Sequence, residues 1–312
     1  MTSDALEPIS LRLDDSQPMA FAAALGASFS RHGFAVVGDH GLDPEGVAGL
    51  LRDMRAFFGL PEAEKHRSFI AGGKGQRGYT PFGVEIAKGA AHVDLKEFWH
   101  VGRELPPDHP LRPLMPENIW PETPVGFSAH ALWLYDALEA LGVRVLRAIA
   151  RYLGLTADYF DDAVRDGNSV LRLLHYPPAP FDGPRIRAGA HEDINAITLL
   201  LGAEEAGLEI LAPDGSWTPI NPPPGAVVIN IGDMLARLTN DVLPSTTHRV
   251  VNPAPERRGI ARYSTPFFLH FRPDFLIETL PACVTADRPD RHPEPITAHA
   301  FLERRLSEIG LG

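Results

Sequence analysis

The chain has 312 residues, of which 44% are hydrophobic, and its formal net charge is −11 at pH 7. This hydrophobic fraction is ample for a packed core, and the negative charge argues against a nucleic-acid partner, because such binding draws on clustered lysine and arginine. No apolar stretch approaches the roughly 20 residues that cross a bilayer, so we expect no membrane partner.

The single cysteine, Cys283, excludes an intrachain disulfide. The N-terminal residues show none of the charged, apolar and small-residue pattern of a secretion signal. We therefore expect a cytoplasmic protein that folds without cross-links. The sequence indicates no oligomeric state.

The first part of the chain, residues 1–167, is predicted to be mixed α/β and largely helical. Apolar residues recur at helical spacing in three stretches, and Asp43 is a candidate N-cap for the second of them. The predicted elements, in chain order, are a helix over 19–31, a strand over 34–37, and helices over 44–58 and 126–153.

The second part, residues 168–312, is rich in short β-type runs separated by proline and glycine turns. Strands are predicted over 170–176, 194–201, 208–211, 217–220, 226–231, 246–251 and 262–270. Many short strands at close spacing indicate a sandwich or a jelly roll. We expect one compact unit, 1–312, of mainly β with α structure, whose cupin-like double-stranded β-helix is braced by N-terminal and central helices.

The most informative motif is His191-Glu192-Asp193, followed by an apolar run and, 55 residues after Asp193, by His248. If the strand begins at the motif, period two aims His191 and Asp193 at one ion and turns Glu192 away. Two imidazoles and one carboxylate are the protein ligands of a non-haem ferrous centre that leaves positions open for co-substrate and dioxygen. We therefore predict a metal site from His191, Asp193 and His248.

A second His-x-Asp pattern, His92-Val93-Asp94, shows that three letters alone are weak evidence. It lacks the β-type residues that follow the later copy. We interpret His92 and Asp94 as an ordinary hydrogen-bonded pair.

A candidate anion clamp lies in Arg262-Tyr263-Ser264. Period two places the guanidinium and the hydroxyl on one face, where the planar donors of arginine can grip a carboxylate. The hydroxyl of Tyr176 could donate to the same carboxylate, with His175 facing the other way. The alternatives are a surface arginine and a core tyrosine.

Together these motifs resemble the isopenicillin-N-synthase-like branch of the 2-oxoglutarate- and Fe(II)-dependent dioxygenases. The likeness covers most of the chain. Besides the ligand motifs and the clamp, it includes residues 57–65 and 94–97, Arg77-Gly78-Tyr79, Gly207-Leu208-Glu209-Ile210, and Asn230-Ile231-Gly232-Asp233.

The resemblance implies that His191, Asp193 and His248 bind Fe(II), and that Arg262, Ser264 and Tyr176 hold the distal carboxylate of 2-oxoglutarate. It further implies that the enzyme oxidises a small molecule with O2, by hydroxylation or desaturation, and releases succinate and CO2. One departure is Leu174, where the family often has asparagine. A polar contact near the metal-bound end of the co-substrate is then missing or supplied elsewhere.

Two other functions remain open at this stage. One is an iron-dependent oxidase of the same fold that does not use 2-oxoglutarate, and the other is a non-catalytic ligand-binding β-sandwich. For the substrate pocket, strand alternation nominates Phe268 and His270, although Pro266 interrupts that register. Aromatic residues of the N-terminal half are weaker candidates for a lid or wall, namely Tyr79, Phe82, Phe98 and Trp99.

Overall fold

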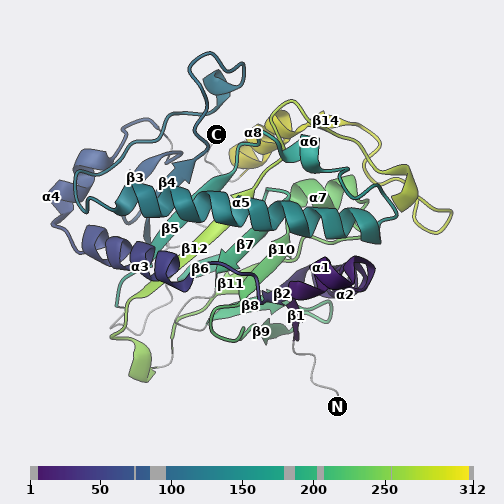
Figure 1. Ribbon diagram of the computed structural model, residues 1–312, viewed down its shortest axis with the longest axis horizontal. Coiled ribbons are helices and arrows are strands. Elements are labelled where there is room, and N and C mark those ends of the chain that lie inside the picture. Colours follow the sequence, from purple (N-terminus) through teal and green to yellow (C-terminus); the bar gives the residue numbers. More distant parts are fainter. Residues whose placement is uncertain are drawn as a thin grey trace.

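The computed structural model describes residues 6–73, 75–84, 96–178, 187–201, 207–253 and 255–308. Within them an eight-stranded sheet forms the centre of the molecule, and its neighbouring strands are antiparallel except for β1 and β2 (Figure 1). Its spatial order is β1 (Pro8–Ser10), β2 (Phe34–Gly38), β10 (Val227–Ile231), β7 (Ile197–Leu201), β12 (Arg262–Leu269), β5 (Val170–Tyr176), β4 (Glu97–Gly102) and β3 (Gly78–Thr80).

A smaller antiparallel sheet faces it, with the order β6 (Ala188–His191), β11 (His248–Val250), β8 (Leu208–Leu211) and β9 (Trp217–Pro219). A third, two-stranded sheet pairs β13 (Leu276–Ile277) with β14 (Ile296–Thr297). Strands from both halves of the chain share the large sheet, because β1 to β4 precede residue 168. Two facing antiparallel sheets give the jelly-roll core that the sequence predicts.

Helices cover the face of the large sheet that points away from the small sheet (Figure 1). The longest helix, α5, lies across β4, β5, β7 and β12, and α2 and α3 pack against it. The helices are α1 (Arg12–Ser16), α2 (Pro18–His32), α3 (Pro44–Phe58), α4 (Glu62–Lys65), α5 (Phe127–Tyr152), α6 (Asp161–Val164), α7 (Asp233–Leu238) and α8 (Ala298–Glu308).

A glycine sets how closely α5 approaches the sheet. A Cβ atom on Gly142 would lie 2.4 Å from Cδ1 of Leu269 in β12, closer than packed carbon atoms come. A larger residue would push the helix away from the strand. Gly142 therefore lets the helix rest directly on the sheet.

Alternation along β5 separates the core from the space between the sheets. Leu171 and Leu173 belong to the main hydrophobic core under the helices. Arg172, Leu174 and Tyr176 line a pocket on the opposite face. One strand thus serves packing with one set of side chains and the pocket with the other.

The predicted fold class, mainly β with α around a jelly roll, is confirmed. The predicted helices form within two residues of the expected ends, and the Asp43 side chain accepts hydrogen bonds from the backbone N–H groups of Glu45 and Gly46. The strand predicted over 194–201 was wrong at its start, because β7 begins at Ile197 and His191 ends the separate strand β6. Strand β4 was not predicted.

Pro266 does not break β12. The strand pairs continuously with β7 through Pro266, which lies opposite Leu200, whereas the pairs with β5 stop at Ser264 and resume at Phe267. Because proline has no N–H, a ladder hydrogen bond is lost only locally. The strand keeps its register into the pocket.

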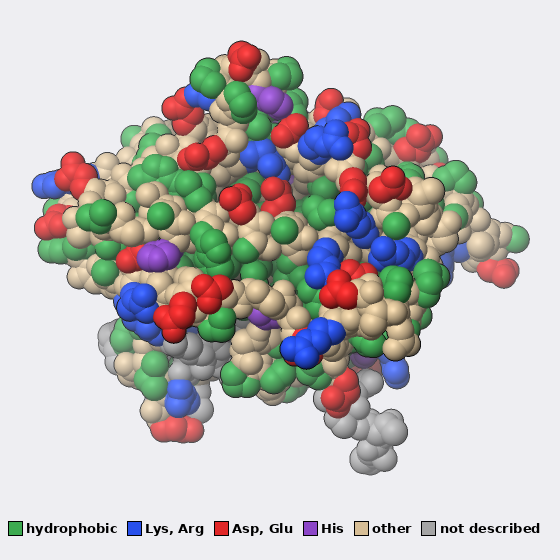
Figure 2. Space-filling model, viewed as in Figure 1, with side chains coloured by type: hydrophobic (Ala, Val, Ile, Leu, Met, Phe, Trp, Pro, Cys, Tyr) green, Lys and Arg blue, Asp and Glu red, His purple; other side chains and the backbone are tan. Residues whose placement is uncertain are grey.

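Along the described parts of the chain, none of the helices combines the length and apolarity required to traverse a lipid bilayer. Figure 2 shows acidic and basic side chains interspersed over the face that carries α5. That face has no continuous basic patch.

Replacing Leu138 of α5 with alanine tests the packing of this helix. The side chain is fully buried, so Leu138→Ala should lower the free energy of unfolding by about 2–5 kcal/mol through lost burial and a residual cavity. Denaturant unfolding measures the loss. Met19→Ala, at a helical residue that is 64% exposed, is the control and should change stability little; equal losses would contradict the packing described.

Candidate metal centre and pocket

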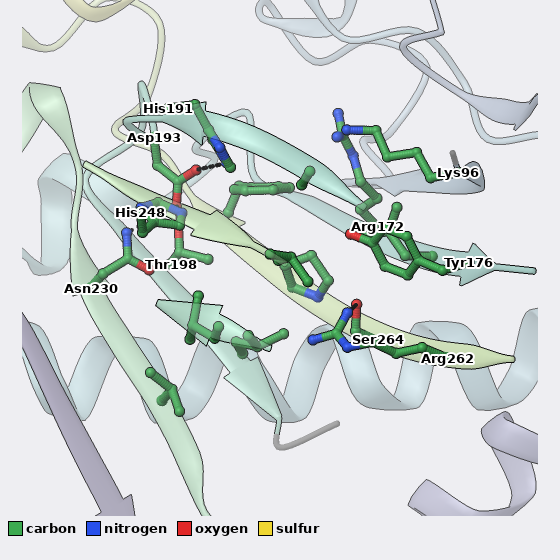
Figure 3. A pocket seen from close by; sticks show the side chains of 18 of the residues that line it. Lys96, Arg172, Tyr176, His191, Asp193, Thr198, Asn230, His248, Arg262 and Ser264 are labelled. Atoms are coloured by element: carbon green, nitrogen blue, oxygen red, sulfur yellow. Dashed lines mark hydrogen bonds and ion pairs between the residues drawn. The ribbon is translucent and has the colours of Figure 1, made fainter. Parts of the chain in front are cut away.

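His191 and His248 are opposite each other in the small sheet. They form a cross-strand pair between β6 and β11, and their ring centroids are 4.4 Å apart. Asp193 lies two residues beyond the end of β6, on the link to β7. Nε2 of His191 is 3.8 Å from one Asp193 carboxylate oxygen, and Nε2 of His248 is 3.9 Å from the other (Figure 3).

Hydrogen bonds to backbone carbonyls orient both imidazoles. Nδ1 of His191 is 2.7 Å from the carbonyl oxygen of Gly189, and Nδ1 of His248 is 3.1 Å from that of Thr246. A carbonyl can only accept, so each Nδ1 carries the proton and donates it. Each Nε2 therefore presents its lone pair to the common centre.

The charge states also suit a cation. His191 is 43% exposed where the pocket meets solvent, yet the protein packed around its ring and the neighbouring His248 lower its pKa to about 4. Burial alone would raise the pKa of Asp193, but the two histidines and two hydrogen bonds lower it. At neutral pH His191 is therefore a neutral imidazole and Asp193 an ionised carboxylate.

A cross-strand pair of the large sheet holds the Asp193 carboxylate. Thr198 of β7 donates to Oδ2 of Asp193 at 2.5 Å, and Nδ2 of Asn230 of β10 donates to the same oxygen at 2.9 Å. Thr198 and Asn230 are opposite each other in the β7–β10 ladder. Asn195 donates to the Thr198 oxygen, which directs the threonine proton toward the carboxylate.

These three residues can hold one metal ion. One ligand atom from each of His191, Asp193 and His248 lies within 4.8 Å of the others, and no other such group of three occurs among the residues described. A set of two imidazoles and one carboxylate suits Fe(II) and leaves positions open. Glu192 is directed elsewhere, since it accepts a hydrogen bond from Thr247.

The metal ligands open onto a pocket of about 620 Å³, including its mouth, between the two sheets. Arg262, Ser264 and Tyr176 line it as well, at a distance from the ligands (Figure 3). Nη1 of Arg262 donates to Ser264 Oγ at 3.1 Å, and its guanidinium carbon is 5.2 Å from the centroid of the Tyr176 ring. The three residues of the predicted clamp thus lie together on the wall of the pocket, with Tyr176 opposite Arg262 on β5.

Of the further pocket candidates, Phe268 lines the pocket and His270 does not. His270 lies just past the end of β12, where Nδ1 is 3.0 Å from the Phe268 carbonyl oxygen. Tyr79 and Trp99 are buried in the main core, and Phe82 is 43% exposed. Phe98 comes nearest to the predicted role, because it packs with the pocket residues Leu174 and Tyr176.

His175 points away from the pocket, as predicted, into a buried polar cluster behind Tyr176. Glu97 accepts hydrogen bonds there from His175 at 2.7 Å, Lys65 at 2.7 Å and Tyr79 at 2.5 Å. Burial alone would raise the pKa of Glu97, but these donors lower it. The cluster ties α4 to β3, β4 and β5 on the face opposite the pocket.

Sequence reasoning assigned no role to four polar residues of the pocket, Thr198, Asn230, Lys96 and Arg172, although Asn230 and Lys96 lie in runs that carry the family resemblance. Thr198 gave a signal, since it is a polar residue within an apolar strand. Arg172 gave none, because it meets the residues of β4 only through the pairing of β4 with β5, which places it opposite His100. Lys96, just before β4, gave no sign that it lines the pocket. His92 and Asp94 lie outside the described residues.

Two family models match the chain. Residues 6–123 match the N-terminal region of non-haem dioxygenases in morphine synthesis, and residues 167–271 match the 2OG-Fe(II) oxygenase superfamily. A curated relative, the 2-oxoglutarate-Fe(II) type oxidoreductase hxnY of Emericella nidulans, is 34% identical over 282 residues, which cover 87% of this chain and 79% of that protein.

Solved structures agree. A 2OG-Fe(II) oxygenase family protein from Caulobacter crescentus is 59% identical, with a TM-score of 0.93 over 98% of this chain and 99% of that one. A full-length Neurospora crassa protein, solved in complex with alpha-KG, is 31% identical, with a TM-score of 0.86 over 98% of each chain.

The chain therefore belongs to the 2OG-Fe(II) oxygenase superfamily. It is a non-haem dioxygenase whose cofactors are Fe(II), 2-oxoglutarate and O2, and which oxidises a small molecule. This finding favours the 2-oxoglutarate-dependent enzyme over the oxidase that the sequence left open.

Replacing Thr198 with the isosteric valine tests the support behind Asp193. Thr198→Val removes a hydrogen bond to the carboxylate and should weaken Fe(II) affinity by about 10- to 100-fold, the usual effect of losing a partner behind a metal ligand. Anaerobic equilibrium dialysis measures the affinity. Thr218→Val, at a half-buried threonine of β9, is the matched control; an unchanged affinity in Thr198→Val would contradict this role.

Proposed function

We propose that His191, Asp193 and His248 bind the catalytic Fe(II), and that Arg262, Ser264 and Tyr176 bind the distal carboxylate of 2-oxoglutarate. The observation that carries this proposal is the placement of both groups on the walls of one pocket. A cation site and an anion clamp facing one cavity match a co-substrate that chelates a metal at one end and carries a carboxylate at the other.

The residues of the chain position and shield the reactants. Asp193 is held by two donors from the large sheet, and the histidine tautomers are set by backbone carbonyls. The walls of the same pocket are partly apolar, with Leu200, Val228 and Leu174 among the lining residues. Such walls exclude water from the space that co-substrate and substrate would occupy.

Iron with 2-oxoglutarate and O2 supplies the oxidising chemistry when bound. We propose that the outcome is hydroxylation or desaturation of the small molecule, with succinate and CO2 as co-products. The protein determines which bond lies next to the metal. The cytoplasmic setting remains a prediction from the sequence.

Anaerobic titration of the ferrous protein with 2-oxoglutarate tests the proposal directly. We expect a weak visible charge-transfer band that saturates at one equivalent, because a chelate of metal and keto acid absorbs there. A ferrous protein that binds iron but develops no band would contradict the proposed co-substrate site.

Removing a ligand should abolish iron binding. His191→Ala deletes one of three protein donors, so Fe(II) affinity should fall by more than about 100-fold, beyond the usual effect of a residue behind a ligand. Anaerobic dialysis followed by iron analysis measures the occupancy. His299→Ala, at a half-buried histidine of α8 far along the chain from the site, is the control; equal iron occupancy in both variants would refute the assignment.

Removing the clamp should weaken the binding of 2-oxoglutarate and leave the binding of Fe(II) unchanged. Arg262→Gln deletes a charged donor, so the Kd for 2-oxoglutarate should rise by about 10- to 100-fold while Fe(II) affinity stays the same. The charge-transfer titration reports the Kd. Arg147→Gln, at an arginine of α5 that pairs with Asp161, is the control; an unaltered Kd in Arg262→Gln would show that the clamp lies elsewhere.

A further inference from the structure

A second cationic corner lies in the same pocket. Lys96, just before β4, and Arg172 of β5 both line the pocket. Figure 3 shows their side chains directed toward each other, on the side of the pocket away from Arg262 and Ser264. The pocket thus has three polar corners, which are the metal ligands, the clamp, and the pair Lys96 and Arg172.

Arg172 is held in position by its surroundings. Nδ1 of His100 is 2.6 Å from the Gly75 carbonyl oxygen and donates to it, so Nε2 of His100 is an acceptor. Nε of Arg172 donates to that Nε2 at 2.5 Å. The guanidinium carbon lies 4.4 Å from the Phe98 ring centroid and 5.4 Å from that of Phe268. An arginine held between two rings and fixed at Nε presents a preorganised donor edge.

Apart from Thr198 and Asn230, which hold Asp193, the remaining walls are apolar. They come from both sheets, with Phe34, Leu200, Leu208, Val228, Val250 and Pro266 among them. An apolar cavity with a few convergent polar groups binds a ligand whose body is apolar and whose polar group is placed to match. Here the polar groups that belong neither to the clamp nor to the metal site are the two cations Lys96 and Arg172.

We propose that Lys96 and Arg172 bind a carboxylate of the primary substrate, which is therefore a small carboxylic acid with an apolar body. This inference rests on the proposed function, because it assigns 2-oxoglutarate to the other cationic corner. A carboxylate placed between the two side chains would accept charge-assisted hydrogen bonds from both. Binding the carboxylate there turns the apolar body toward the metal ligands.

Matched pairs of acids and primary amides test the proposal. The anaerobic protein is saturated with Fe(II) and 2-oxoglutarate, so that the clamp is filled. It is then titrated calorimetrically with benzoate, phenylacetate, cinnamate and hexanoate, and with the amide of each. We expect at least one acid to bind at least about tenfold more tightly than its amide, as a charge-assisted hydrogen bond predicts.

Variants test whether the preference for an acid over its amide arises from Lys96 and Arg172. Arg172→Gln and Lys96→Gln should each bring the acid-to-amide affinity ratio close to one, whereas Arg172→Lys should keep part of it. Arg291→Gln, at an exposed arginine that pairs with Asp241, is the control and should keep the wild-type ratio. Charge-transfer titration of every variant shows that it folds and binds 2-oxoglutarate. If Arg172→Gln does not fold, Lys96→Gln alone decides, because Lys96 is only half-buried.

The outcomes separate the two proposals. If no acid binds more tightly than its amide, or if both variants keep the ratio, the substrate inference is wrong, although a normal charge-transfer band would leave the proposed function standing. If Lys96→Gln and Arg172→Gln instead weaken 2-oxoglutarate, the second corner belongs to the co-substrate. A wild-type protein without the band would contradict the proposed function itself.

Discussion

The carboxylate of Asp193 is the group on which the arrangement of the site depends. It lies between two sheets, on the link that leaves β6 of the small sheet and enters β7 of the large one. Thr198 and Asn230 of the large sheet donate hydrogen bonds to it. His191 and His248 of the small sheet lie within 4 Å of its oxygens. A buried carboxylate without such donors would be costly to keep charged. With them, it fixes one sheet relative to the other at the point where chemistry occurs.

The large sheet keeps packing and chemistry apart by turning alternate side chains to opposite faces. On β5, Leu171 and Leu173 join the core beneath α5, and Arg172 and Tyr176 reach the pocket. The cluster around Glu97 lies on the core side of the same strands and fixes the end of β5 next to Tyr176. Stability is thus generated on one face, and the other face is available for polar groups that a core would not tolerate.

Much of this could be predicted from sequence, where a pattern is local. Helical periodicity gave α2, α3 and α5, and short apolar runs between turns gave most strands of the jelly roll. The candidate metal residues were nominated from type and spacing, and the structure brings them together, but the stated reason was incomplete, because His191 and Asp193 do not share a strand. The pairing of His191 with His248 brings the imidazoles together, and hydrogen bonds from the large sheet hold Asp193 beside them. Lys96 and Arg172 could not be predicted, since pairing between segments more than 70 residues apart decides which side chains meet.

The position of β6 has a consequence for the energetics of the whole fold. This strand is at the rim of the small sheet, where β11 is its sole ladder neighbour in the described chain, yet it ends on His191. An ion bound by His191, His248 and Asp193 would cross-link β6 to β11 and to the segment that connects β6 with β7. Because only the folded chain brings the three ligands together, the free energy of unfolding would rise with the concentration of free metal. The supply of iron would then determine the stability of the protein as well as its activity.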